Sequence, residues 1–115
     1  MKNTVKAKIS WIPASAGGRK RLPRGPIYST VASFEDDWGQ SPLSWSIIAE
    51  FLQAPDPKSG CTLANIRFLA PNAPLALLHP GSRFQLFEGP RLVATGEVSR
   101  ERVEPQAERQ ELVFA

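Results

Sequence analysis

The sequence predicts an all-β domain, and three observations support that prediction. Short apolar runs recur with the two-residue period of half-buried strands. Eleven prolines and eight glycines lie largely between these runs, as expected for a sheet with many turns. The 115 residues are 42% hydrophobic and 22% charged, which fits one globular domain over residues 1–115. The turn spacing is typical of a small barrel or a sandwich.

The first half of the chain contains three predicted strands. Residues 5–11 alternate apolar side chains with lysine and serine, the pattern of a half-buried strand. Residues 27–34 are rich in β-branched and aromatic side chains and end at the acidic triplet 35–37. Residues 45–52 are apolar on both faces, which predicts a central or well-covered strand.

The segment between residues 54 and 81 is interrupted by turns. Residues 54–60 contain two prolines and a glycine, so neither a helix nor a central strand fits there. Residues 61–69 read as a fourth strand with Ala64, Ile66 and Phe68 on one face. Prolines surround residues 75–78, which we interpret as a short strand or a crossover.

The remaining strands are predicted to form a hairpin. Residues 83–87 and 92–98 flank a turn at 88–91 that contains Gly89. Residues 100–115 follow either as a frayed tail or as an additional edge strand. This gives six or seven strands in all.

A core follows from the apolar face of each predicted strand. We expect the following side chains to be largely buried: Ile9, Trp11, Val31, Ile47, Phe51, Phe68, Phe84, Leu86 and Val93.

Positive charge is concentrated near the start of the chain. Residues 1–34 contain seven lysines and arginines and no acidic residue, although the net charge of the whole chain is only +3. Four of the cations, which we expect to reach solvent, lie within six residues: Arg19, Lys20, Arg21 and Arg24. The cluster has three interpretations. It could bind nucleic-acid phosphates, it could dock an acidic protein surface, or it could be a solvated loop without a partner.

Few residues are suited to catalysis. The chain has one cysteine, Cys61, which we interpret as a small buried side chain, and one histidine, His79, which we place in an exposed turn. The carboxylates at 35–37 lack the spacing of a calcium loop and read as a solvated turn. Glu88 and Glu97 flank the hairpin, but no sequence rule places their carboxylates at the separation that a glycosidase requires. We therefore expect no enzyme, no metal site and no cofactor.

Nucleotide, membrane and base-stacking functions are also disfavoured. The glycines at 17–18 resemble a phosphate loop, but residues 22–26 contain two prolines, which exclude the helix that such a loop requires. No apolar run approaches the roughly 20 residues that span a bilayer, and we expect a cytoplasmic protein. Among the aromatic side chains, Tyr28 is close in sequence to the basic cluster and could stack on a base.

Two segments resemble the C-terminal β-barrel domain of elongation factor Tu. Residues 6–12, KAKISWI, followed by Gly17-Gly18-Arg19 and Gly25, are similar to its opening strand and glycine-glycine-arginine loop. Residues 81–98, GSRFQLFEGPRLVATGEV, are similar to its closing hairpin. The resemblance covers residues 5–98 loosely and implies a closed six-stranded antiparallel barrel that hydrolyses nothing. Closure would also hide the strand edges.

The family's barrel helps to grip the T-stem backbone of aminoacyl-tRNA and contacts other proteins. The resemblance places Arg19 where the loop arginine contacts tRNA, and Gly89 at the first glycine of the hairpin turn, beside Arg91. Two positions differ from the family. The second glycine of the hairpin turn is Pro90 here, which removes a backbone N–H donor. The lysine that precedes a proline in the family's preceding strand falls near Ala73, so one phosphate contact is missing.

We therefore expect a non-catalytic, stand-alone binding module that docks a protein partner through the basic cluster. The alternative is a tRNA- or RNA-binding accessory protein that uses the same residues.

Overall fold

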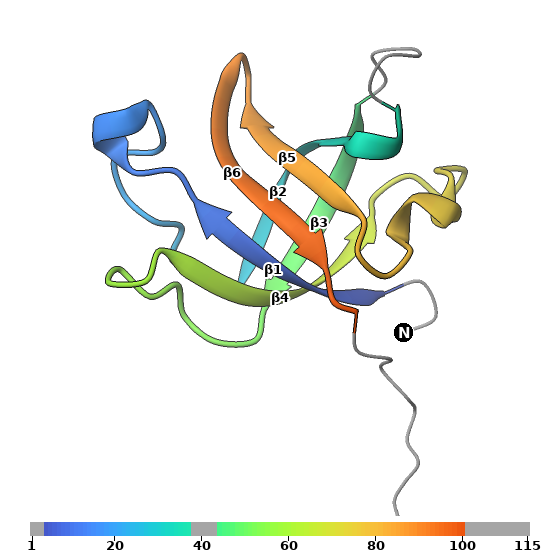
Figure 1. Cartoon of the computed structure of the whole chain (residues 1–115), viewed down its shortest axis with the longest axis horizontal. Helices are drawn as coiled ribbons and strands as arrows, with labels where there is room; N and C mark the ends of the chain where they lie inside the picture. Colours follow the sequence, from blue (N-terminus) through green and yellow to red (C-terminus); the bar gives the residue numbers. More distant parts are fainter. Residues whose placement is uncertain (1–3, 38–43, 101–115) are drawn as a thin grey trace, which may run out of the picture.

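The computed structural model describes residues 4–37 and 44–100, which form one closed β-barrel (Figure 1). Six antiparallel strands follow one another around it in the order β1-β4-β3-β2-β5-β6, and β6 pairs again with β1. Their bounds are β1 Val5–Trp11, β2 Ile27–Phe34, β3 Trp45–Phe51, β4 Cys61–Phe68, β5 Arg83–Glu88 and β6 Arg91–Val98. The predicted all-β barrel is confirmed, and the sandwich is excluded.

The connections contain three short 3-10 turns: η1 Ala14–Ala16, η2 Glu35–Asp37 and η3 Leu75–Leu78. For residues 75–78, the prediction of a short strand is wrong, because the segment forms η3, and that of a crossover is confirmed, because η3 lies in the connection from β4 to the non-adjacent β5. Its last two side chains, Leu77 and Leu78, are buried in the core. An isolated strand would leave backbone groups unpaired here, whereas the turn bonds the Leu77 N–H to the Pro74 carbonyl at 3.0 Å.

Eight of the nine side chains expected in the core are buried, and Val31 is the exception. Val31 is 36% exposed, while its neighbours Ala32 and Phe34 are fully buried. Both faces of β2 carry apolar residues, so alternation alone did not fix which face turns inward. The Phe34 ring packs against Phe68 and Phe84, with ring centres 5.5 and 5.3 Å away.

The outer side of β3 is not covered, contrary to expectation. Ile47, Ala49 and Phe51 point into the barrel, but Ile48 is partly exposed and Leu52, just past the strand, is exposed. One face of each strand lines the barrel interior, and the other face is exposed to solvent.

Phe84 fills the space beside a glycine of the neighbouring strand. Phe84 lies opposite Gly96, which in turn lies opposite Ile9 of β1. A Cβ atom on Gly96 would come within 2.2 Å of the Phe84 ring, so the glycine makes room for a large aromatic side chain inside a narrow barrel.

The predicted tail or edge strand falls on residues 101–115, which lie outside the described residues. None of the helical turns in the described ranges has the length and apolarity needed to cross a membrane.

Truncating the central ring should destabilise the barrel strongly. Phe84→Ala removes a side chain that is 1% exposed and should lower the free energy of unfolding by about 3–5 kcal/mol. The outward-facing Val31→Ala is the control and should cost less than about 1 kcal/mol. Urea unfolding of both variants would measure the difference. Equal stability of the two variants would contradict the inward placement of Phe84.

Candidate functional site

The segment that carries the cation cluster, which we call the basic loop (residues 17–25), is fixed to one end of the barrel by two glycines. A Cβ atom on Gly18 would lie 1.8 Å from the carbonyl oxygen of Ile12, so no other residue fits there. Gly25 has a φ of 68° and faces the Phe51 ring, which a Cβ atom would approach to 2.6 Å. The loop therefore starts and ends in close contact with the barrel.

A hydrogen-bonded cluster joins the basic loop to the tip of the β5–β6 hairpin. The Arg19 guanidinium forms an ion pair with the Glu88 carboxylate at the end of β5. The same carboxylate accepts a hydrogen bond from the Tyr28 hydroxyl at the start of β2. Arg19 also donates from Nε to the Arg21 carbonyl at 2.8 Å, and its guanidinium carbon lies 5.8 Å from the centre of the Tyr28 ring. The basic loop, the start of β2 and the hairpin tip thus meet at Glu88, which is 60 residues or more from the other two in the sequence.

The protonation behaviour of this cluster follows from its contacts. Partial burial alone would raise the pKa of Glu88, but hydrogen bonds from Tyr28 and Arg19 and the charges of Arg19 and Arg91 hold that pKa below its ordinary value. Burial and the hydrogen bond to Glu88 raise the pKa of Tyr28 to about 12. Near neutral pH, Glu88 is therefore an anion and Tyr28 a neutral donor.

The other cations of the loop point into solvent. Lys20, Arg21 and Arg24 are exposed, as predicted, whereas the Arg19 side chain is only 31% exposed because it packs against Glu88. Arg91, the first residue of β6, is also exposed, and its Nη1 lies 3.5 Å from the Gly18 carbonyl oxygen.

We call these five residues the cationic site: Arg19, Lys20, Arg21, Arg24 and Arg91. Apart from Arg19, none of them forms an ion pair with any residue in ranges 4–37 and 44–100. Gly89, in the hairpin turn between Glu88 and Arg91, has a φ of 61° and is exposed. Lys20, Arg21 and Arg24, together with Arg91 beside Glu88, produce a positive potential at this end of the barrel.

Sequence reasoning placed Arg19 and Arg91 near the site but missed the role of Glu88. The sequence offers Glu97 as a possible partner of Glu88, yet Glu88 lies at the hairpin tip and Glu97 lies opposite Arg83 at the other end of the hairpin. Arg19 and Glu88 are 69 residues apart, so no local pattern could reveal their contact.

Tyr28 is not available as a base-stacking platform. Its ring packs edge-on against Trp11, with centres 5.5 Å apart, and stacks on Phe51 at 6.2 Å. Phe34 is buried and Trp45 packs against the Phe68 ring, while Trp38 lies outside the described residues.

The remaining candidates lie away from the cationic site. Cys61 is partly exposed rather than buried, with its Sγ 3.7 Å from the Ser10 hydroxyl. His79 is exposed, as predicted, and its Nε2 lies 2.7 Å from the Asp36 carboxylate, whose hydrogen bond raises the pKa of His79. Among the residues described, no three His, Cys, Asp or Glu side chains gather closely enough to hold a metal ion.

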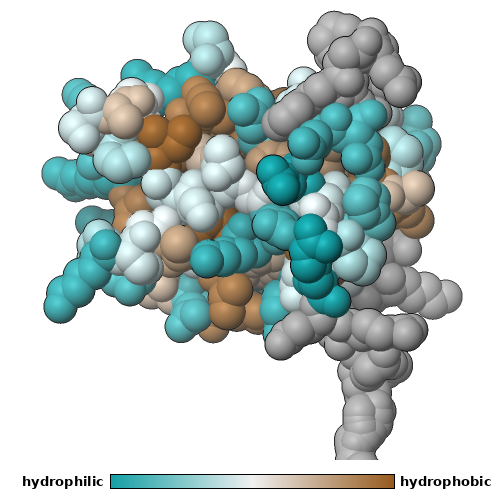
Figure 2. All heavy atoms as spheres, in the orientation of Figure 1, coloured by the Kyte–Doolittle hydropathy of each residue, from teal (hydrophilic) through white to brown (hydrophobic). Residues whose placement is uncertain are grey.

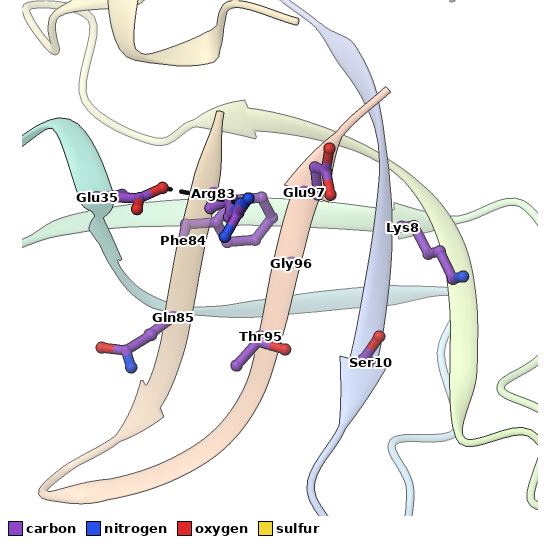
Figure 3. A pocket seen from close by; sticks show the side chains of 9 residues that line it. All are labelled: Lys8, Ser10, Glu35, Arg83, Phe84, Gln85, Thr95, Gly96 and Glu97. Atoms are coloured by element: carbon purple, nitrogen blue, oxygen red, sulfur yellow. Dashed lines mark ion pairs between the residues drawn. The ribbon is translucent and has the colours of Figure 1, made fainter. Parts of the chain in front are cut away.

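A hollow of about 430 Å³ lies on the outer face of β5, β6 and β1 (Figure 3). Phe84 and Gly96 belong to its lining, and Gln85, Thr95 and Ser10 contribute uncharged polar groups. At one edge Arg83 approaches Glu35, with Nε 3.9 Å from the carboxylate oxygen. The hollow is separate from the cationic site.

No protein-family model matches the chain, and a search of curated proteins finds no match.

The Tyr28–Glu88 hydrogen bond should be visible in a titration, because Tyr28 is the only tyrosine of the chain. Tyrosinate absorbance should show a midpoint near pH 12, compared with about 10 for a free tyrosine. The folded state then holds a proton that the unfolded state releases, so stability should fall as pH rises from about 10 to about 12.

Glu88→Gln should lower this midpoint, because the anion that stabilises the neutral hydroxyl is removed. Glu97→Gln, at the other end of the hairpin, is the matched control and should leave the midpoint unchanged. Tryptophan fluorescence recorded in parallel would show whether the barrel is still folded. A midpoint that Glu88→Gln does not move would rule out the contact.

Proposed function

We propose that the protein is a non-catalytic binding module that docks an acidic surface of a protein partner through the cationic site. The observation that carries this proposal is the Glu88-centred cluster, which holds the basic loop against the hairpin tip. The contact of Arg91 Nη1 with the Gly18 carbonyl oxygen, at 3.5 Å, is a second link between the two segments. With these links, Arg91 and the loop cations form one surface whose charges are held near one another before a partner arrives, which reduces the ordering cost of binding.

The surroundings of the titratable groups support a binding role over catalysis. Glu88 is neutralised by Arg19, and His79 is paired with Asp36. The closest side-chain polar contact of Cys61 is the Ser10 hydroxyl, which is not a general base. These pairs fix local structure, and no nucleophile lies beside a base within them.

The barrel architecture agrees with the resemblance to the C-terminal domain of elongation factor Tu. The adjacency of Arg19 and the hairpin turn favours the alternative, an RNA-binding accessory protein, because both contribute to tRNA contact in that family. Two features favour a protein partner instead. The Arg19 guanidinium is paired with Glu88, and the Tyr28 ring packs against both Trp11 and Phe51. RNA would therefore find cations but no stacking surface among these residues.

Removing the exposed loop cations should abolish partner capture without unfolding the barrel. The variant Lys20→Ser/Arg21→Ser/Arg24→Ser leaves Arg19 in place, because Arg19 has a structural contact with Glu88. Its free energy of unfolding should stay within about 1 kcal/mol of the parent, as for most surface substitutions. Affinity capture from lysate, followed by mass spectrometry, would compare the bound proteins.

The matched control is Lys6→Ser/Lys8→Ser/Lys58→Ser, which removes the same charge from other parts of the barrel and should leave capture intact. Nuclease treatment separates the two partner classes. A protein retained after nuclease supports protein docking, whereas loss on nuclease treatment, with steep salt dependence, supports RNA. If the loop variant captures everything that the parent captures, the cationic site is only solvated surface.

A further inference from the structure

Apolar side chains form a row across the outer face of the barrel, on strands β6, β5 and β2 and past the end of β4. Leu92 lies opposite Phe87, and Phe87 lies opposite Val31. Val31 lies opposite Ser46, whose carbonyl accepts a hydrogen bond of 2.9 Å from the Leu69 N–H. We call Leu92, Phe87, Val31 and Leu69 the apolar row.

The members of this row are open to solvent. Leu69 is 57% exposed and Val31 is 36% exposed. Phe87 and Leu92 are partly exposed and lie outside the core and outside the partly buried hydrophobic residues that pack against it. A register shift between Leu86 and Phe87 brings these two large side chains opposite each other.

The neighbouring row on the same outer face is polar. Ser33 lies opposite Gln85, Gln85 opposite Thr95, and Thr95 opposite Ser10. Apolar side chains scattered singly over a surface need no explanation, whereas a contiguous set such as Leu92, Phe87 and Val31 indicates an interaction site. Leu69 lies beyond the polar Ser46 of β3. Leu92, Phe87 and Val31 are consecutive cross-strand neighbours on these strands, whereas Ile27, at the start of β2, is exposed outside the row.

The apolar row begins where the cationic site ends. Arg91 directly precedes Leu92, and the next cross-strand pair toward the hairpin tip is Glu88 with Arg91. The charge of Glu88 is already compensated by Arg19. Figure 2 shows apolar surface over the hairpin near its tip, bordered by hydrophilic side chains. A ligand that contacts Leu92 and Phe87 therefore also lies beside Arg91 and close to the basic loop.

We propose that the apolar row and the cationic site together bind an acidic amphipathic segment of a protein partner. This inference rests on the proposed function and specifies the chemistry of the partner: apolar side chains flanked by aspartate or glutamate. The apolar atoms would be removed from water on the barrel wall, and the carboxylates would meet Arg91 and the basic loop. A nucleic-acid backbone would gain nothing from Val31 or Leu69.

Site-specific photo-crosslinking tests the row separately from the loop. p-Benzoylphenylalanine is placed at position 31 or 69 in the row, at position 21 in the loop, and at position 75 in η3 as a control. All four native side chains are exposed, and melting curves would verify that each protein is folded. The proteins are irradiated in cells that naturally produce the chain, and the adducts are mapped by mass spectrometry.

The proposal predicts one protein adduct shared by positions 21, 31 and 69 and absent from position 75, with crosslinked peptides that contain apolar residues flanked by acids. A synthetic peptide of the mapped segment should then bind the parent protein. Its Kd should rise about tenfold for Val31→Ser/Leu69→Ser, and Leu75→Ser should leave it unchanged.

Other outcomes overturn the inference in distinguishable ways. Adducts at position 21 alone would leave the proposed function standing and remove the row. Nuclease-sensitive adducts would point to RNA, and an adduct with twice the chain mass would identify a second copy of the chain. Absence of adducts at all positions would remove both the row and the proposed function.

Discussion

Closure of the sheet between β1 and β6 is the constraint on which the other features of the protein depend. Because β1 pairs with both β4 and β6, the barrel leaves no strand edge free. A six-stranded barrel encloses little space, and several inward positions hold only small side chains: Ala7, Ala32, Ala49, Ala64 and Ala94 are all fully buried. Gly96 continues this pattern beside Phe84. Alternation of small and large residues thus allows the strands to close around the core.

Closure also determines where a partner can bind. With the interior filled and the backbone edges paired, the surfaces left are the connections at the two ends and the outer faces of the strands. Antiparallel pairing brings the end of β1, the start of β2 and the β5–β6 turn to one end of the barrel, where Arg19, Tyr28 and Glu88 meet. The positive charge of the chain is concentrated there, while the acidic residues Glu35 and Asp36 lie beyond the opposite end of β2.

Much of the strand layout could be predicted from local patterns. The runs at 5–11 and 27–34 coincide with β1 and β2, and the hairpin prediction placed β5, its turn and β6 within one or two residues. Alternation failed where both faces were apolar, as at Val31, because only packing against Phe68 and Phe84 decides that Phe34 points inward. It also failed at residues 75–78, where η3 satisfies the backbone between prolines.

The sequence by itself determined the strand periodicity, the turn positions and the concentration of cations at Arg19, Lys20, Arg21 and Arg24. Each of these features depends only on residues that are close along the chain. Tertiary structure alone decided which face of β2 is buried, that Glu88 anchors the basic loop, and that Leu92, Phe87 and Val31 adjoin. These features depend on cross-strand register and barrel closure, which join residues tens of positions apart through contacts that no local period encodes.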